Sequence, residues 1–453
     1  MNPKRRTARV GLALLLSTGA LPLCHSQDLL DVWQMAIARD PIYAATGAGR
    51  QADQEAVPQA RARLLPYITA DAAAEADDTR RTRGLHEHRT DRRALWALTL
   101  TQPVIDLGAW NSLKQSEYVA SSADVAQAGA YQDLILRVTQ SYFDILAAQD
   151  TLRALLAEKS AIKTQLQAAQ LGFELGGVTI IDSQETQARL DLVNAQELLA
   201  RNTLQVTQDQ LARIIAERPQ QLAELAADTQ LPAPRPNRLE EWTTQSAQAN
   251  LTVARAELAA RIVEKQIDIA KSEHYPRLYL QAQTGSASDQ GINEDRSGPR
   301  SLNSSIGLQL SIPIYAGGGI SSTVREQTSR LQQARYELED ARRVAVASTQ
   351  RYFSGVTSGL ARVEALRAAE KSSLAALQAN QTGYEVGVRV NIDVLNAQQQ
   401  LYETQRNLAL TRYNTLMDSL RLKAASGILT DADIVAINQL LTHRQPQGDK
   451  TRP

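Results

Sequence analysis

The sequence repeats its plan once, at a spacing of 210 residues. Pro276 follows Pro66 at this spacing (276 − 66 = 210), and Pro313 follows Pro103 (313 − 103 = 210). Between about Ala109 and Leu171 there is no proline, and apolar residues recur every three or four positions, which predicts one continuous helix. Such a helix would be about 90 Å long at roughly 1.5 Å per residue, so neither half can be an ordinary compact domain.

Each half also contains two segments in which apolar residues alternate with polar or small ones. The apolar residues occupy every second position from 96 to 100 and from 306 to 312. This alternation predicts four strands of about 9 to 11 residues, the length that crosses the apolar layer of a membrane in a β-barrel. Charged loops are predicted within the pairs, from Asp77 to about Arg93 and from about Gly285 to Arg300. The positions predicted to face lipid are Trp96, Leu98, Leu100, Ile306, Leu308, Leu310 and Ile312.

Four strands are too few to close a barrel. The smallest single-chain barrels have about eight, and an open sheet edge is not tolerated in lipid because its backbone groups would stay unpaired. The pattern therefore predicts that copies of the chain associate, and a trimer would supply about twelve strands. The alternative at this point is a small soluble sandwich of the same strands, with the helices forming a separate coiled coil.

Two glycine-broken turns separate each long helix from the helix that follows it. In both turns a Glu lies two residues before a Gly, and an Asp lies six residues after that Gly. The residues are Glu174, Gly176 and Asp182 in the first turn, and Glu385, Gly387 and Asp393 in the second. The following helices are predicted from about Ile180 to Glu217 and up to about Ala425. In the second of these, two series at multiples of seven predict a coiled-coil seam. They are Val394, Leu401, Leu408 and Leu422, and Leu395, Tyr402, Ala409 and Leu416.

The predicted fold is mainly α, with a membrane β-barrel part made from four strands per copy. Each half runs helix, strand, strand, long helix, turn and helix, which gives an elongated helical body with strands at one end and both turns at the other. The predicted units are a signal peptide (1–26), a first structural repeat (27–235), a second structural repeat (236–426) and a C-terminal equatorial or tail segment (427–453), short and polar.

The first 26 residues have the pattern of a secretory signal. A basic start precedes a short apolar run, Val10 to Leu16, which is too short to span a bilayer. Cleavage is expected after Ala20 or Ser26. The only cysteine, Cys24, follows Leu23 rather than a small residue, so lipidation is not favoured. The signal and the lack of a later apolar span leave the periplasm, the medium or the outer membrane as locations.

The composition points away from nucleic acids and from catalysis. The chain has 49 basic and 49 acidic residues, and four of the basic ones lie in the expected signal, so no basic patch for nucleic acid is indicated. His86, Glu87 and His88 lie in a predicted loop without helical metal-ligand spacing. The glycines from Gly317 to Gly319 lack the Gly-Lys-Ser/Thr of a phosphate-binding loop, and they are expected to turn a strand into the long helix. Neither an enzyme, a metal site nor a cofactor is predicted.

Several short motifs, in this order and doubled, resemble the TolC family of outer-membrane efflux and secretion ducts. The resemblance runs from Asp28 to about Leu441. Its motifs are Ala36 with Asp40-Pro41, Leu64-Leu65-Pro66, Leu100 to Asp106, Leu310 to Gly318, the two glycine turns, and Gly427-Ile428-Leu429. It implies a homotrimer in the outer-membrane lipid of a Gram-negative bacterium, with a twelve-stranded barrel and a helical tunnel across the periplasm. It also implies a periplasmic adaptor and an inner-membrane pump, ABC-type or proton-driven, as partners at the closed end of the tunnel. The cargo, small molecules or a secreted protein, stays open.

The resemblance also assigns roles within the two turns. Asp182, Tyr384 and Arg389 stand where the family forms the bonds that hold its coiled coils closed. Asp393 stands where three carboxylates converge on the trimer axis, and Asn396 replaces the second acidic residue that the family usually has there. The positions that match adaptor contacts are Leu175, Gly176, Gly177, Val386, Gly387 and Val388, although Gly177 is smaller than the usual residue.

Simpler interpretations remain beside these. Asp182 and Asp393 could be helix N-terminal charges, favoured by the helix dipole, and Arg389 could be a solvated surface charge. For the whole chain the alternative function is a periplasmic coiled-coil adaptor or scaffold that never enters the outer membrane.

Overall fold

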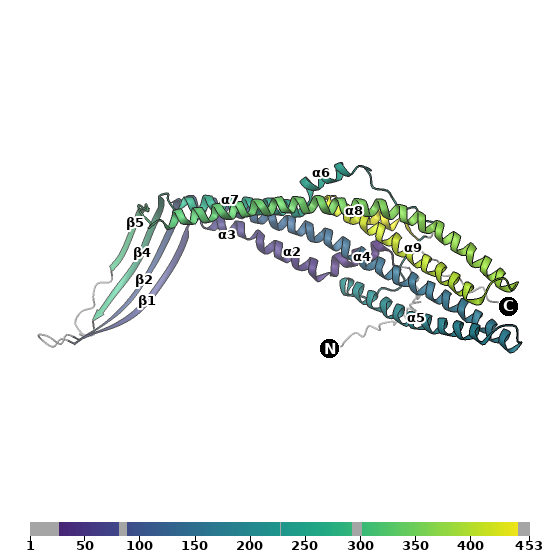
Figure 1. The fold of residues 1–453 in the computed structure, drawn as a ribbon. Coiled ribbons are helices and arrows are strands. Elements are labelled where there is room, and N and C mark those ends of the chain that lie inside the picture. The colour runs from purple at the N-terminus through teal and green to yellow at the C-terminus, as the bar shows by residue number, and fades with distance from the viewer. Residues whose placement is uncertain (1–26, 81–87, 227, 292–300, 443–453) are drawn as a thin grey trace, which may run out of the picture.

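The protein is an elongated rod of helices with a β-sheet at one end (Figure 1). The computed structural model describes residues 27–80, 88–226, 228–291 and 301–442. The predicted signal peptide and residues 443–453 lie outside this part of the chain. Among the described residues, no helix combines the length and the apolar character that crossing a membrane requires.

The order of elements confirms the predicted repeat of helix, strands, long helix and helix. The first half comprises α1 (Leu29–Arg39), α2 (Pro41–Gln54), α3 (Ala56–Ala62), β1 (Tyr67–Arg80), β2 (His88–Ile105), α4 (Leu107–Glu174), α5 (Ile180–Ile215) and β3 (Glu224–Leu225). The second half comprises α6 (Leu239–Ala249), α7 (Leu251–Ser272), β4 (Arg277–Gly291), β5 (Ser301–Ser311), α8 (Gly319–Glu385), α9 (Asn391–Ala425), α10 (Asp431–Asn438) and β6 (Leu441–Thr442). The two long helices, α4 and α8, have 68 and 67 residues.

The helix break at Asp40 has a clear local cause. Its carboxylate accepts a hydrogen bond from the backbone N–H of Tyr43 at 2.7 Å, which caps α2, and Pro41 occupies the first turn. Asn250 caps α7 in the same way at the matching point of the second half. Burial opposes ionisation of Asp40. Two hydrogen bonds from Arg137, at 3.0 and 3.1 Å, and hydrogen bonds from backbone N–H groups outweigh this effect, so the pKa of Asp40 is lowered.

The four long strands form one antiparallel sheet in the order β1-β2-β4-β5. They contain 14, 18, 15 and 11 residues, so the predicted length of nine to eleven was too short for the first three. The predicted loop from Asp77 to Arg93 was also too long, because Asp77 pairs with Asp91 and the ladder continues to Arg80. Backbone pairing needs no apolar side chains, so the strands continue where the alternation ends.

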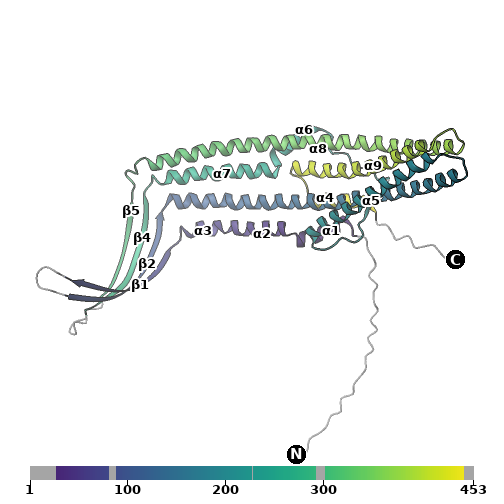
Figure 2. The same cartoon turned by 60° about the horizontal axis from the view of Figure 1, so that its bottom comes forward.

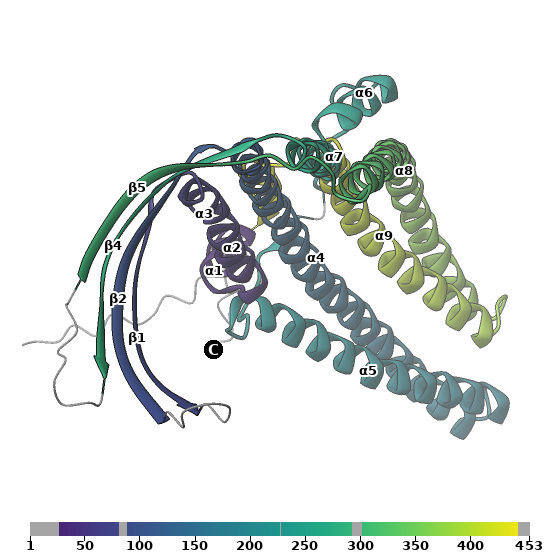
Figure 3. The same cartoon turned by 90° about the vertical axis from the view of Figure 1, so that its left-hand side faces the viewer.

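The sheet continues into a single curved layer of helices. α3 packs on α4, α4 on α7, and α7 on α8, which repeats the order of the strands (Figures 2 and 3). The layer has two open edges. One is formed by β1 with α2 and α3, and the other by β5 with α8. No residue of α2 is fully buried, as expected for a helix at an edge.

At the other end of the rod, α4 with α5 and α8 with α9 form two helical hairpins. The predicted heptads of α9 face two different neighbours. Val394 and Leu401 pack in a cluster with Leu377 of α8. Leu395 packs instead among residues of α4 and α5, including Leu155 and Val193. One helix therefore joins both hairpins.

The main core lies in the middle of the rod, where α1, the end of α5, the end of α9 and α10 surround α4. Tyr142 and Phe143 of α4 are fully buried there. The segment after Gly427 was predicted to be a C-terminal equatorial or tail segment, short and polar, but Leu429, Ile434 and Ile437 are buried in this core. Ile434 and Ile437 lie three residues apart on one side of α10, and this side packs inward.

Candidate gate at the helical turns

Both glycine turns lie at the end of the rod opposite the sheet (Figure 1). Gly176 and Gly387 have φ values of +74° and +76°, a conformation that side chains rarely adopt and that ends α4 and α8. The six residues predicted to contact an adaptor are all exposed at these turns: Leu175, Gly176, Gly177, Val386, Gly387 and Val388. Their accessibility is consistent with a docking role, which stays a prediction.

Asp182 contributes to both the turn and its neighbour. Its carboxylate accepts hydrogen bonds from the backbone N–H of Thr179 at 3.1 Å and from the Thr179 hydroxyl at 2.8 Å, so it closes the first turn of α5. The same charge acts on Tyr384 of the other hairpin. Burial raises the pKa of the half-buried Tyr384, and the negative charge of Asp182 raises it further. The capping bonds agree with the interpretation of Asp182 as a helix N-terminal charge, and a bond between Asp182 and Tyr384 stays a prediction.

Arg389 and Asp393 form a pair within one turn. The Nη1 atom of Arg389 lies 3.6 Å from Oδ2 of Asp393, four residues later and in the first turn of α9. In a single copy, Arg389 therefore lies beside Asp393 of its own hairpin, and this partly exposed pair leaves both side chains accessible to solvent. Asn396 does reach that hairpin, because its Oδ1 accepts a hydrogen bond from Nη2 of Arg189 at 3.2 Å.

Asn391, which the sequence did not single out, connects three helices. Its side chain is fully buried. Its amide donates to the Thr186 hydroxyl at 2.7 Å and to the carbonyl oxygen of Asp182 at 3.2 Å, and its Oδ1 accepts from Gln165 at 2.7 Å. A signal was available, since Asn391 lies seven residues before Gln398, another buried polar residue on the same face of α9.

Two carboxylates of α4, the buried Glu158 and the half-buried Asp150, bond to α9 further along the rod. Glu158 accepts a hydrogen bond from Arg406 at 3.1 Å, and Asp150 accepts one from the Tyr413 hydroxyl at 2.7 Å. Burial raises the pKa of both carboxyls, while the Arg406 and Tyr413 bonds lower it by less. Polar contacts thus accompany the apolar packing of Leu395 along the seam between the hairpins.

The predicted lipid-facing residues lie far from this site, at the sheet. Six of the seven are exposed, and Leu100 is half-buried. Leu308 pairs with Leu280 on the neighbouring strand, so large apolar side chains stand side by side on one face. Which face meets lipid stays a prediction.

The remaining motifs have simple positions. Gly317 and Gly318 have φ values of +62° and +81° and lead the chain from β5 into α8, as predicted. Among the described residues, no group of three or more His, Cys, Asp or Glu side chains is placed to hold a metal ion. His86 and Glu87 lie outside the described residues, and His88 begins β2.

Comparison with known proteins agrees with the fold and with the doubled sequence. The model of the family described as "Outer membrane efflux protein" matches residues 32–217 and 242–428, one match in each half. Outer membrane protein TolC of Escherichia coli is 30% identical over 442 residues, covering 96% of this chain and 88% of its own. The proteases secretion protein PrtF of Dickeya chrysanthemi is 29% identical, covering 96% and 95%.

A solved structure shows the same fold at low sequence identity. The outer membrane channel CmeC of Campylobacter jejuni superposes with a TM-score of 0.77 at 15% identity, covering 97% of this chain and 98% of its own. With one family model matched in both halves and a relative at 30% identity over nearly the whole chain, this protein belongs to the outer membrane efflux protein family, the TolC-like exit ducts of the Gram-negative outer membrane.

Proposed function

We propose that three copies of this chain form a passive exit duct, with a β-barrel in the outer membrane and a helical tunnel in the periplasm. The observation that carries this proposal is the single curved layer with two open edges. Among the described strands, β1 and β5 are the two ends of the sheet and each pairs with one neighbouring strand, and open sheet edges are costly in lipid. Joining β5 of one copy to β1 of the next, head to tail, closes the ring and leaves no edge.

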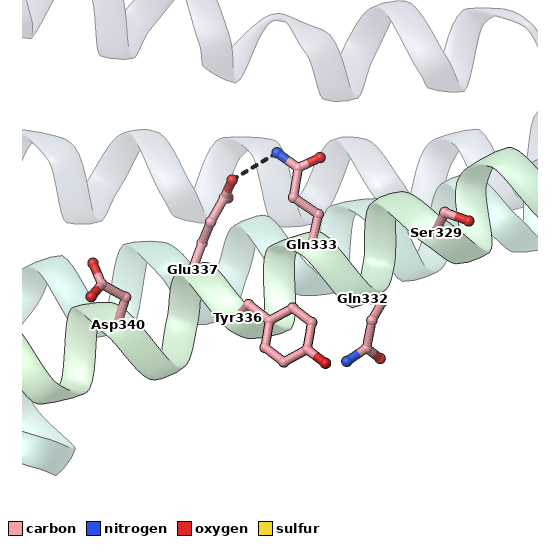
Figure 4. A pocket seen from close by; sticks show the side chains of 6 residues that line it. All are labelled: Ser329, Gln332, Gln333, Tyr336, Glu337 and Asp340. Carbon is pink, nitrogen blue, oxygen red and sulfur yellow. Dashed lines mark hydrogen bonds between the residues drawn. The ribbon is translucent and has the colours of Figure 1, made fainter.

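The helical edges support the same arrangement. Six residues of α8 line a shallow surface hollow: Ser329, Gln332, Gln333, Tyr336, Glu337 and Asp340 (Figure 4). Glu337 accepts a hydrogen bond from Gln333 at 2.8 Å, and Tyr336 projects on another side of the helix and is 68% exposed. In the trimer, this edge of α8 would meet α2 and α3 of the next copy, whose exposed residues include Arg50, Arg61 and Arg63. Exposed polar and charged side chains would therefore meet across this contact.

In this trimer the turns would form the periplasmic mouth. Three copies of Asp393 would converge near the axis and attract cations. Asp182, Tyr384 and Arg389 would hold the mouth narrow. Asn396 leaves the ring with three charges fewer than a mouth with a second acidic residue would have.

Partners follow from the position of the turns. An adaptor would dock on Leu175, Gly176, Gly177, Val386, Gly387 and Val388, and an inner-membrane pump would supply the energy. The duct could serve small-molecule efflux or one-step protein export. No chemical step is assigned to the chain.

Cell fractionation followed by planar-bilayer recording tests the proposal. We expect heat-modifiable trimers in the outer-membrane fraction and discrete ion-conducting events after reconstitution. A protein extracted by carbonate from the periplasm, without heat-modifiable trimers and without conductance, would instead support the coiled-coil scaffold.

A further inference from the structure

Helix α9 packs against both hairpins. Toward α8 it presents Val394 and Leu401, which pack against Leu377. Its other face carries polar groups. Arg406 bonds to Glu158 of α4 at 3.1 Å. α9 is therefore bound to its own hairpin near the turns by the apolar packing of Val394 and Leu401, and to the other hairpin by hydrogen bonds of this kind together with the apolar side chain of Leu395.

Next to the glycine turns, the contact between the hairpins is made by the hydrogen bonds of Asn391. Asn391 has no exposed surface, and its single amide group bonds to Gln165 of α4 and to Thr186 and Asp182 of α5. The bond to Asp182 joins it to the residue whose carboxylate closes the first turn of α5. Asp393, the expected ring residue, lies only two positions further along α9.

These contacts decide how the seam can separate. While the site is dry, moving α9 away from α4 and α5 breaks all three hydrogen bonds of Asn391 and leaves buried polar groups unpaired. Once water enters, the same groups are rehydrated. The apolar contacts of Val394 and Leu401 with α8, and of Leu395 with α4 and α5, gain nothing from water. The hydrogen bonds of Asn391 are therefore the contacts of this seam that water can replace.

We propose that Asn391 is a positioning residue of the periplasmic mouth, which latches α9 to the α4–α5 hairpin and so sets the place of Asp393. The proposal rests on the proposed duct function. It adds a contact inside each copy to the expected bonds of Asp182, Tyr384 and Arg389. On the other hairpin, Gln165 donates a hydrogen bond to Asn391 and Thr186 accepts one from it.

The test is single-channel conductance of the full-length trimer in planar bilayers. Asn391→Leu keeps the branched shape of the side chain but removes every hydrogen bond of the latch, and we expect a several-fold rise in conductance. Asn380→Leu is the matched control. Asn380 donates to the carbonyl oxygen of Ala376 in its own helix, so conductance should match the wild type.

A second variant covers the case in which Asn391→Leu does not assemble. Thr186→Val removes one hydroxyl from the latch, and we expect a smaller rise. In the double variant Asn391→Leu with Thr186→Val, conductance should not rise above that of Asn391→Leu alone. The hydrogen bond between the two positions is already absent in the single variant. Wild-type conductance in assembled Asn391→Leu trimers overturns the proposal, as does wild-type conductance in Thr186→Val if the first variant fails. A wild-type protein that forms no channels would refute the duct, not the latch.

Discussion

Burial shifts the pKa of individual side chains in this protein. Asp144 of α4 is half-buried, and burial raises the pKa of its carboxyl, although the Gln140 hydrogen bond at 2.7 Å and the charge of Arg421 work in the opposite direction. An acid whose pKa is raised in the folded state favours folding when protonated. Its contribution is present at low pH and is lost as the pH rises through the folded-state pKa.

Replacing Asp144 with Asn should therefore stabilise the protein at neutral pH. The amide keeps an acceptor for Gln140 but carries no charge that burial disfavours. The midpoint of thermal loss of helical circular dichroism in detergent should be higher for Asp144→Asn at pH 7.5. The difference should shrink as the pH falls toward the ordinary aspartate pKa of about 3.9. A difference that does not change with pH would contradict this account.

At the scale of elements, the sequence predicts what local chemistry decides. Gly176 and Gly387 end the long helices as expected, because only glycine adopts their positive φ readily. The strand lengths were underestimated, because backbone pairing does not depend on apolar alternation. Asn391 was missed because its role exists only where three helices meet. Composition alone made the segment after Gly427 look like a tail, whereas its apolar residues fill the core that the other elements create.

The close approach of α8 and α9 provides a test at this scale. A Cβ atom on Gly359 would lie 2.4 Å from Oγ1 of Thr415 and 3.2 Å from its Cβ. Ala gains up to about 1 kcal/mol over Gly in a helix, but overpacking costs about 1–3 kcal/mol. We expect Gly359→Ala to lower the free energy of unfolding in denaturant titrations.

Thr415→Ala should restore stability in the double variant. The Thr415 hydroxyl donates to the carbonyl oxygen of Thr411 within its own helix, so its removal costs little. If the double variant is no more stable than Gly359→Ala, the two side chains are not in conflict and the helix contact is looser than described.

The sheet gives a prediction for the assembly of the whole molecule. Leu308 is 67% exposed, and Gln309 beside it points to the opposite face of β5. Arg on the lipid face of a barrel costs about 2–4 kcal/mol near the membrane centre, whereas the lumen tolerates charge. Leu308→Arg should reduce heat-modifiable trimers in outer-membrane fractions, and Gln309→Arg should not. The reverse outcome would mean that the lipid face was assigned to the wrong side.

Charge at the mouth is a property of the complete trimer, because each copy contributes one Asp393 to the ring. Asp393→Ala should therefore weaken the block of channel current by Mg²⁺. Asn396→Asp adds three carboxylates to the ring and should strengthen the block. The increase should be smaller than for unpaired carboxylates, because Arg189 already bonds to Asn396 at 3.2 Å and would pair with the new charge. Removing that partner in Asn396→Asp with Arg189→Gln should strengthen the block further. Equal block in both Asn396→Asp variants would mean that this position faces away from the axis, and that Asp393 alone forms the ring.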